Sequence, residues 1–390
     1  LAGAQTASGL LQFDFDFLKG RPGDNDRTKI TQTAYIVRQG SAALALAKYY
    51  RATRDASVRD ALVRLIAGLG KSGVRIGRPA LLPWLDATGL LSTSVGRLTL
   101  TALLDRLGLL YRPTGSGRLL AYHDDIETAW AGGSAVALLA ELFYAEASGD
   151  QQFKALRLGW RDGLLALRRR DGGFRIYPRS LDETPYANGE AWLALAELAA
   201  HGDQTATAAL RQIEPPLIAR NTAKPEWHFF GWSAMAARTR YLTTHDPRYL
   251  RFIAGQAENL LASQPLKDSD DENSCAEVEG LAAATMALAA GGQRQSDLYQ
   301  RLQRRIDVEM ARNNALQIAP DQQRIDLSGG AALTSPRLAD FAGAYLAGTA
   351  QPFVRVDITA HCISALVELM PEAAGEAAPA GAQPATSKKP

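Results

Sequence analysis

The sequence predicts an all-α fold, a ring of stacked helical hairpins, from a helix-turn-helix pattern that returns about every 45 to 50 residues. In each unit an Ala- and Leu-rich amphipathic stretch leads into a short turn, and a second amphipathic stretch follows. The turns contain Asp55, Asp150, Asp203, Asp246 and Asp297. Because one hairpin cannot bury its own apolar face, each is expected to pack against its neighbours.

Hydrophobic periodicity sets the expected elements. A half-buried strand is expected at 10–17, where LLQFDFDF alternates apolar and acidic residues. Residues 71–125 are irregular and rich in Gly and Pro, and we expect an inserted hairpin there with one helix near 93–107. The other expected helices are 31–51, 58–69, 126–146, 153–169, 186–200, 205–213, 231–243, 247–261, 275–290, 298–312 and 358–369.

One domain is expected. Residues 1–370 would form a single toroid domain, in which 1–30 is an N-terminal strand and loop segment. Residues 371–390, PEAAGEAAPAGAQPATSKKP, carry too few apolar side chains to offset the entropy of ordering, so we expect a disordered tail.

Composition disfavours two classes of partner. The 390 residues include 43 Lys plus Arg and 41 Asp plus Glu, a net charge of +2, which provides no general attraction for nucleic acid. No apolar run is long enough to cross a membrane. The first residues, LAGAQTASG, resemble a trimmed end, so an exported protein, periplasmic or secreted, is one interpretation. No Walker loop, GxSxG elbow or HExxH helix occurs, and we expect neither a cofactor nor a metal.

The chain has two cysteines, Cys275 and Cys362. They are too few for a disulfide framework or a Cys-based metal site. Each lies in an apolar helical pattern, where we expect a small buried side chain.

The lengths of the loops indicate where the functional site lies. The Asp-containing turns are short, whereas the connections between hairpins are long and carry most of the Gly, Pro, aromatic and acidic residues. If about six hairpins close into a ring, the long loops share one face. That face is the expected active site.

Three segments resemble a known fold family: DGGFRIYP at 171–178, PYANGEAWLALAEL at 185–198, and the stretch 229–250. Together they are similar to the six-hairpin (α/α)6 toroids of glycoside hydrolases, polysaccharide lyases and sugar epimerases. The last two are also similar to the catalytic domain of glucuronyl C5-epimerases, which share the Ser-Ala-Met-Ala at 233–236. Ala237 and Arg238 replace a Gln-Gly pair of that family. The resemblance implies a toroid that acts on carbohydrate.

A first candidate cluster is YHDDIETAW, residues 122–130. Asp124 or Asp125 could serve only as a helix N-cap. Alternatively, the density of acids and aromatics suits a sugar-binding rim, with Asp125 as a catalytic candidate and with Asp124 and Tyr122 as binding candidates.

A second cluster surrounds the expected helix start near 186. Tyr186 and Glu190 are four residues apart and share one helix face. Glycoside hydrolysis needs a pair of carboxyl groups, whereas a Tyr beside a carboxylate can exchange a proton at carbon in lyases and epimerases. Asn188 is a binding candidate. A capped helix end with solvated acids is the alternative.

The third cluster is KPEWHFFGW, residues 224–232, expected as an aromatic loop in front of a helix. His228 is the catalytic candidate because it is expected in this loop. Glu226, Trp227 and Trp232 are binding candidates. A structural histidine with buried aromatics is the alternative. We expect Asp125, Tyr186, Glu190 and His228 to line one cleft, with Trp227 or Trp232 as a stacking wall.

Two further segments are less specific. The acidic stretch 268–280 lacks the order of an EF-hand, so a solvated loop before a capped helix is expected, with Glu277 rather than Glu279 turned inward. Asp357 and His361 are four residues apart and could form a proton shuttle or a clamp that seals the last hairpin against the first.

The expected function is a carbohydrate-active enzyme for an oligo- or polysaccharide that works by carboxylate or Tyr acid-base chemistry. Hydrolysis remains an alternative to C5-epimerisation or elimination. An Arg-rich stretch favours a uronate-containing glycan, since guanidinium groups pair with carboxylates; its members are Arg168, Arg169, Arg170, Arg175 and Arg179. The competing class is a non-catalytic glycan-binding or polysaccharide-assembly subunit. No DDxxD cluster supports a terpenoid-cyclase type of toroid.

Overall fold

A computed structural model describes residues 1, 3, 5–22, 29–76, 116–169, 171–178, 180, 182–265 and 272–370. The helix expected near 93–107, the tail 371–390, Arg170 and Arg179 lie outside the described residues.

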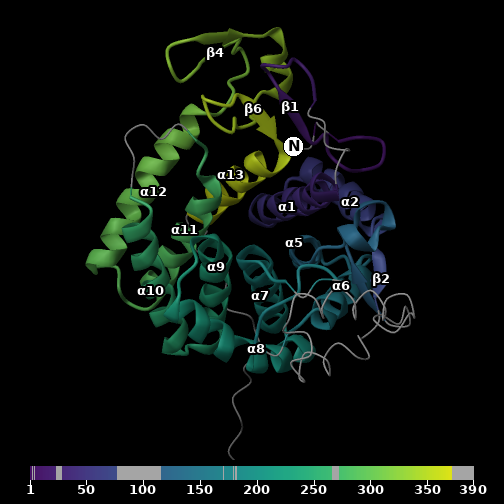
Figure 1. Ribbon diagram of the computed structural model, residues 1–390, viewed down its shortest axis with the longest axis vertical. Coiled ribbons are helices and arrows are strands. Elements are labelled where there is room, and N and C mark those ends of the chain that lie inside the picture. Colours follow the sequence, from purple (N-terminus) through teal and green to yellow (C-terminus); the bar gives the residue numbers. More distant parts are fainter. Residues whose placement is uncertain are drawn as a thin grey trace, which may run out of the picture.

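An inner ring of helices forms the centre of the molecule (Figure 1). Each inner helix packs against the next, and the last packs against the first, which closes the ring. In ring order they are α1 (Lys29–Thr53), α5 (Ala131–Ser148), α7 (Pro185–Ala200), α9 (Trp227–Thr244), α11 (Cys275–Ala290) and α13 (Val356–Leu369). These helices are covered on nearly all sides, as α5 illustrates, since every residue from Ala131 to Ala145 is buried.

Outer helices surround this ring, each packed on the inner helix that precedes it in the chain. They are α2 (Ala56–Lys71), α6 (Lys154–Ala166), α8 (Gln204–Ala223), α10 (Pro247–Ser263) and α12 (Asp297–Ala315). Five inner-outer hairpins are therefore present in the described residues, and α13 completes the inner ring. The all-α toroid expected from the sequence is confirmed.

The short turns lie at the carboxyl ends of the inner helices. Asp55, Asp203 and Asp246 cap the outer helices that follow, accepting backbone N–H bonds of 2.9, 2.8 and 2.9 Å. Asp150 accepts a hydrogen bond from the Tyr144 hydroxyl. Since each outer helix returns antiparallel, every inner helix begins on the opposite, long-loop face.

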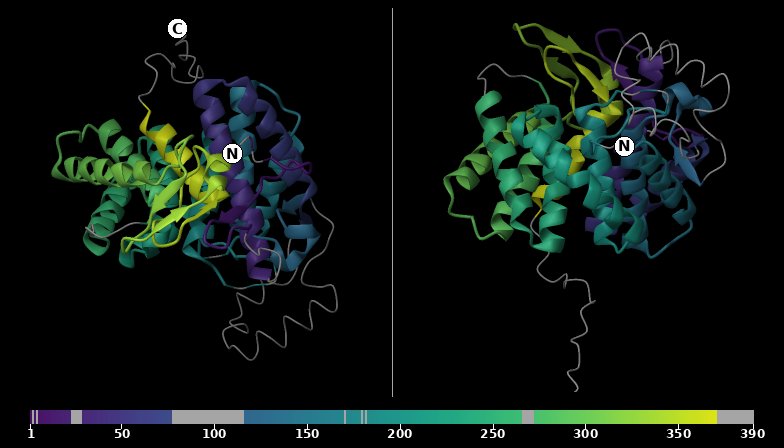
Figure 2. Two further views of the ribbon diagram at one scale, coloured as in Figure 1. Left: turned by 90° about the horizontal axis from the view of Figure 1, so that it is seen from above. Right: turned by 60° about the horizontal axis from the view of Figure 1, so that its bottom comes forward.

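Three short antiparallel strand pairs lie in the connections. They join β1 (Asp14–Asp16) to β6 (Phe353–Arg355), β2 (Val74–Ile76) to β3 (Gly117–Leu119), and β4 (Arg324–Asp326) to β5 (Ala332–Thr334). Short 3-10 turns lie at Tyr122–Asp124, Ile126–Thr128 and Pro336–Phe341. The β1–β6 pair lies beside α1 and α13 (Figure 1 and Figure 2). The expected strand at 10–17 is confirmed in its centre, where Phe13, Phe15 and Phe17 are buried.

Several expected boundaries are wrong. α9 begins at Trp227, so His228 lies in a helix and not in a loop; Pro225 and the extended backbone of Glu226 end the loop earlier. α8 continues beyond 213 through two prolines, because Leu217 and Asn221 extend its buried face. The segment expected to start a helix at 126 instead forms a 3-10 turn, Ile126–Thr128, and α5 begins at Ala131. In the segment 171–178 the extended pairing is a single bridge between Arg168 and Phe174.

The two cysteines form a disulfide, which corrects the expectation of two separate buried thiols. Cys275 opens α11, and Cys362 lies in α13, with their Cα atoms 4.8 Å apart and both side chains fully buried. The sequence separation of 87 residues hides this pairing. The bond joins α11 to α13, and α13 in turn packs against α1 to close the ring.

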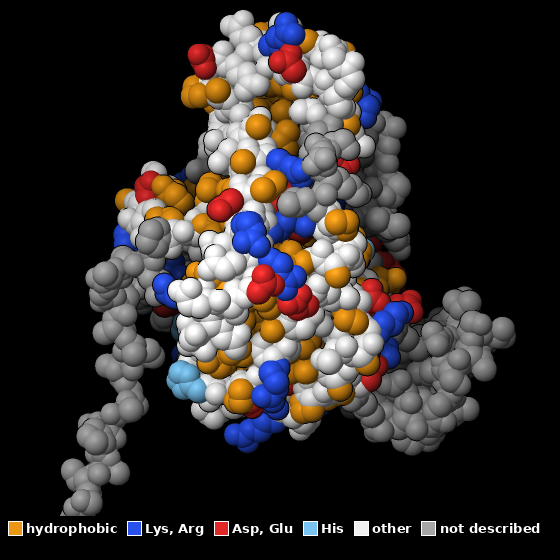
Figure 3. Space-filling view, turned by 90° about the vertical axis from the view of Figure 1, so that its left-hand side faces the viewer, with side chains coloured by type: hydrophobic (Ala, Val, Ile, Leu, Met, Phe, Trp, Pro, Cys, Tyr) orange, Lys and Arg blue, Asp and Glu red, His pale blue; other side chains and the backbone are white. Residues whose placement is uncertain are grey.

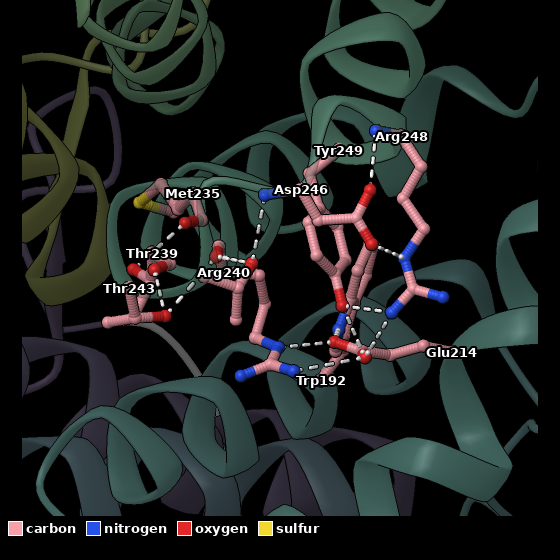
Figure 4. A network of polar contacts seen from close by, with 10 residues as sticks. Trp192, Glu214, Met235, Thr239, Arg240, Thr243, Asp246, Arg248 and Tyr249 are labelled. Carbon is pink, nitrogen blue, oxygen red and sulfur yellow. Dashed lines mark hydrogen bonds and ion pairs between the residues drawn. The ribbon is translucent and has the colours of Figure 1, made fainter.

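A buried carboxylate joins four helices at the side of the ring. Glu214 of α8 accepts bonds from Trp192 in α7 (3.1 Å), Arg240 in α9 (2.8 Å) and Tyr249 in α10 (2.6 Å), and Arg248 lies 3.4 Å away (Figure 4). Glu214 is fully buried, so these partners offset the cost of removing its charge from water. This network is structural.

The outer surface carries both signs of charge. On the side seen in Figure 3, Lys and Arg side chains lie among Asp and Glu side chains in the coloured part. Within the described residues, no helix has the length and apolar character to cross a membrane.

Candidate active site

A cleft of about 510 Å³ lies where the inner helices begin. It has the size of a small-ligand site. The first turns of α7, α9, α11 and α13, the residue before α5, and the middle of α1 all contribute to its wall. The polar, charged and large aromatic side chains of its wall include Arg38, Trp130, Tyr186, Glu190, Trp227, His228, Trp232, Glu277, Glu279, Arg355, Asp357 and His361. Helix N-termini carry partial positive charge, which favours electron-rich ligands here.

Among the described carboxyl groups of the cleft wall, Glu190 is the one that is not in an ion pair. It lies in the second turn of α7, only 5% exposed, with its carboxyl group against Gly132 and Trp130. Glu190 Oε2 has no hydrogen-bond partner among the described residues. Burial raises the pKa of Glu190 to about 8, against a smaller opposing effect of His361. Glu190 is therefore largely protonated at neutral pH.

Three rings form an aromatic ledge beside Glu190, made of Tyr186, Trp227 and His228. The ring centroid of His228 lies 4.9 Å from Tyr186 and 3.5 Å from Trp227. Tyr186 and Trp227 are 45% and 50% exposed, so the ledge offers a contiguous apolar surface to a ligand. Burial, and then the charge of Glu190, raise the pKa of Tyr186, whereas burial lowers the pKa of His228.

A buried ion pair closes the inner end of the cleft. His361 Nδ1 lies 2.9 Å from Glu279 Oε2, and Lys48 Nζ lies 3.8 Å from the other Glu279 oxygen. Burial opposes the charged form of His361, but the charge and hydrogen bond of Glu279 outweigh it and raise the pKa of His361. Trp232 stands edge-on to His361, with 6.3 Å between ring centroids.

Two arginines share one carboxylate on the cleft wall. Arg355 Nε and Nη2 lie 2.6 and 3.0 Å from the two Asp357 oxygens. Arg38 Nε of α1 lies 3.1 Å from Asp357 Oδ2. Burial would raise the pKa of Asp357, but hydrogen bonds and charge from Arg355, with the charge of Arg38, lower it.

The structure brings five of the predicted site residues together: Tyr186, Glu190, Trp227, His228 and Trp232. Asp125 is not on the cleft wall. It caps a 3-10 turn by accepting a 2.9 Å bond from Glu127 N. Asp124 accepts a 2.9 Å bond from Gly73 N, and Tyr122 packs edge-on against Tyr35, with ring centroids 5.7 Å apart. The capping alternative thus describes Asp125 best.

Three other predicted residues also lie away from the cleft wall. Arg175 is buried and donates to the Ala166 carbonyl at 2.7 Å. Asn188 accepts a 2.8 Å bond from Phe174 N, which fixes the loop before α7. Glu226 lies 3.6 Å from Lys224 in front of α9. Arg169 pairs with Asp171, and no described member of the Arg-rich stretch lines the cleft.

The positions of Glu277, Glu279 and Asp357 also differ from expectation. Glu277 and Glu279 both line the cleft, and Glu279 is the more buried because it pairs with His361, whereas Glu277 lies 2.7 Å from Arg305. Asp357 bonds to the arginines and not to His361. Its pairing with Arg38 joins α13 to α1, which fits the predicted clamp.

Sequence reasoning missed Arg38 and Lys48. Both lie inside α1, surrounded by apolar and small residues that give no motif. A basic residue at a buried helical position is a signal in principle, since an unpaired buried charge is costly. It becomes informative only when the partners on α11 and α13 are known.

The chain matches no family model and no curated protein sequence. Solved structures share its fold across 94% of the chain. The GH76A α-1,6-mannanase from Salegentibacter sp. HEL1_6 has 11% identity, 94% coverage and a TM-score of 0.57. A sugar epimerase from a ruminal bacterium is 10% identical, with 94% of each chain covered and a TM-score of 0.55. An unsaturated glucuronyl hydrolase specific for heparin is also 10% identical, with 94% of this chain and 92% of that chain covered and a TM-score of 0.55. The fold is therefore the (α/α)6 toroid, and the expected resemblance is confirmed.

Proposed function

We propose that this protein is a carbohydrate-active enzyme that binds a glycan in the cleft and uses Glu190 as a general acid. The observation that carries the proposal is the buried Glu190 carboxyl group, whose Oε2 has no hydrogen-bond partner among the described residues, beside the aromatic ledge. Burying a carboxyl group without a hydrogen-bond partner costs free energy, and carboxyl groups with a strongly raised pKa are common at catalytic sites. Exposed aromatic rings next to it suit the apolar faces of a sugar. The three neighbours of shared fold act on carbohydrates by name.

Proton exchange at carbon fits the cleft better than two-carboxylate hydrolysis. Hydrolysis requires a second, ionised carboxylate that attacks the sugar or activates water. The described carboxylates on the cleft wall other than Glu190 are Glu277, Glu279 and Asp357, and each lies in an ion pair. Tyr186 lies one turn before Glu190 on the same helix. In our proposal neutral His228, whose ring lies against Tyr186, takes the proton from carbon. Glu190 then donates its proton to that carbon in epimerisation, or to the leaving oxygen in elimination.

A non-catalytic glycan-binding role is the second candidate. The same ion pairs favour it, because a binding site needs the aromatic ledge and no unpaired carboxylate. The two candidates differ in the role of Glu190: an enzyme loses turnover when its acidic proton is removed, and a binding protein keeps its affinity.

The test is a panel of neutral and acidic polysaccharides incubated with the protein in deuterated water. Epimerisation shows as deuterium in the product, elimination as an unsaturated sugar, and hydrolysis as new reducing ends. On any processed glycan, Glu190→Gln is expected to lower turnover about a hundredfold or more. Asp55→Asn is the matched control, since Asn also caps a helix and Asp55 lies on the opposite face. Equal turnover in both variants would exclude Glu190 as the acid, and binding without turnover on every glycan would favour the binding protein.

A further inference from the structure

Two guanidinium groups meet one carboxylate at the junction of the first and last inner helices. Arg38 comes from α1, and Arg355 and Asp357 come from the start of α13. All three side chains line the cleft. The side chains of Arg38 and Arg355 are 28% and 26% exposed, so both remain accessible from the cleft.

Within this group of three side chains, positive charge exceeds negative charge. Glu279 is balanced by His361, and Glu277 by Arg305. Glu190 is largely neutral at pH 7. Asp357 faces two arginines, so these three side chains together carry a net charge of +1, while Glu277 and Glu279 place negative charge elsewhere on the wall.

Asp14 does not remove this excess from the cleft. It lies opposite Arg355 in the β1–β6 pair and attracts Arg38 more weakly than Asp357 does. It is not part of the cleft wall. The two guanidinium groups therefore border the cleft, and the carboxylate of Asp14 does not.

Hydrogen-bond donors remain as well. In the described contacts, Arg38 reaches Asp357 through Nε, and Arg355 through Nε and Nη2. Both Nη groups of Arg38 and Nη1 of Arg355 are left for another acceptor. A guanidinium group with paired N–H donors matches the two oxygens of a carboxylate.

We propose that Arg38 and Arg355 form a subsite for the carboxylate of an acidic sugar. This inference rests on the proposed function and names its substrate class. α13 is three places from α7 in the six-helix ring, so the subsite lies across the cleft from Glu190. A uronic acid unit that spans the cleft would place its carboxylate on the arginines and its ring near Glu190 and the aromatic ledge.

The test is binding, measured by tryptophan fluorescence, because Trp130, Trp227 and Trp232 all line the cleft. The probes are oligosaccharides of alginate, hyaluronate and pectate, each compared with its carboxyl-reduced, neutral counterpart. We expect at least one acidic oligosaccharide to bind about tenfold or more tightly than its reduced form, with a preference that weakens in salt. A sulfated oligosaccharide and its desulfated form make a second arm, and selectivity for sulfate alone would overturn the carboxylate assignment.

Arg38→Gln is expected to abolish the preference for the acidic form and to leave the binding of the neutral form within about twofold. Arg51→Gln is the matched control on the same helix, since Arg51 pairs with Glu146 far from the cleft. A circular dichroism melt of each variant reports folding, and Arg38→Lys, which keeps the charge, is expected to restore part of the preference if Arg38→Gln unfolds. Equal binding of acidic and reduced probes by the parent protein would overturn the subsite alone. Binding of neither class would overturn the proposed function too.

Discussion

Gly132 lies so close to the carboxyl group of Glu190 that a methyl group on the Gly132 Cα would overlap Glu190 Oε2. The two residues belong to adjacent inner helices, α5 and α7. The missing side chain at 132 therefore provides the space in which the acid sits, and Trp130 borders the same space.

Gly132→Ala is expected to displace the Glu190 carboxyl group and to lower turnover at least tenfold, since small displacements of an acid are costly. Stability should change little if Glu190 turns toward the cleft. The measurement is turnover on the processed glycan beside a thermal melt. Gly255→Ala in α10 is the control, because a methyl group there meets nothing within 4 Å; a Gly132→Ala variant as active as this control would contradict the close fit.

The pH profile of turnover is expected to fall on the alkaline side near pH 8. Burial raises the pKa of Glu190 from 4.5 to about 8, so the acid form prevails below that pH and is lost above it. Turnover should thus be retained at neutral pH and decline as Glu190 ionises. Initial rates measured from neutral pH to above pH 8 test this profile. A rate that rises through pH 8 would indicate that the ionised carboxylate is the active form.

Trp227→Ala is expected to weaken glycan binding about tenfold or more without loss of stability. Trp227 is 50% exposed, so its removal costs little packing but takes away most of the aromatic ledge. Titration followed by calorimetry measures the affinity. Leu242→Ala, another exposed apolar position of α9, should bind like the parent protein; equal affinity in both variants would remove the ledge from the binding site.

Glu214→Gln is expected to lower the free energy of unfolding by about 3 to 5 kcal/mol, because it leaves Arg240, whose side chain is only 12% exposed, without its counter-charge. Turnover per folded molecule should not change, as Glu214 is remote from the cleft wall. Urea unfolding gives the free energy. Asp246→Asn, an exposed capping position, is the comparison, and a loss as small as in that variant would show that the network contributes little.

The double variant Cys275→Ala and Cys362→Ala is expected to lose about 4.5 kcal/mol of unfolding free energy, from the entropy of closing a loop of 87 residues. The same unfolding experiment measures it. Mass spectrometry of the parent protein, with and without reduction, checks that the bond is formed. An intact bond would also favour the interpretation of an exported protein, since disulfides persist in oxidising compartments. Two alkylated thiols in the native protein would refute the pairing.

Part of the candidate site could be predicted because Tyr186 and Glu190 are close in sequence. Their spacing of four residues puts them on one helix face, and the aromatic run at 227–232 lies at a helix start whatever the exact boundary. Asp125 shows the limit of such reasoning. An acid that caps a turn and an acid that faces a cleft have the same local sequence, and only the packing of the loop separates them.

The sequence by itself determined the architecture: hairpin period, short capped turns and long loops follow from local periodicity and from side chains that bond to their own helix ends. The tertiary structure alone decided which charges meet. Arg38 reaches Asp357, Cys275 reaches Cys362, and Gly132 makes room for Glu190. These contacts exist only because the ring brings α13 against α1, α11 against α13, and α5 against α7. The charge and pKa of a buried group depend on neighbours distant in the chain, and no local pattern records them.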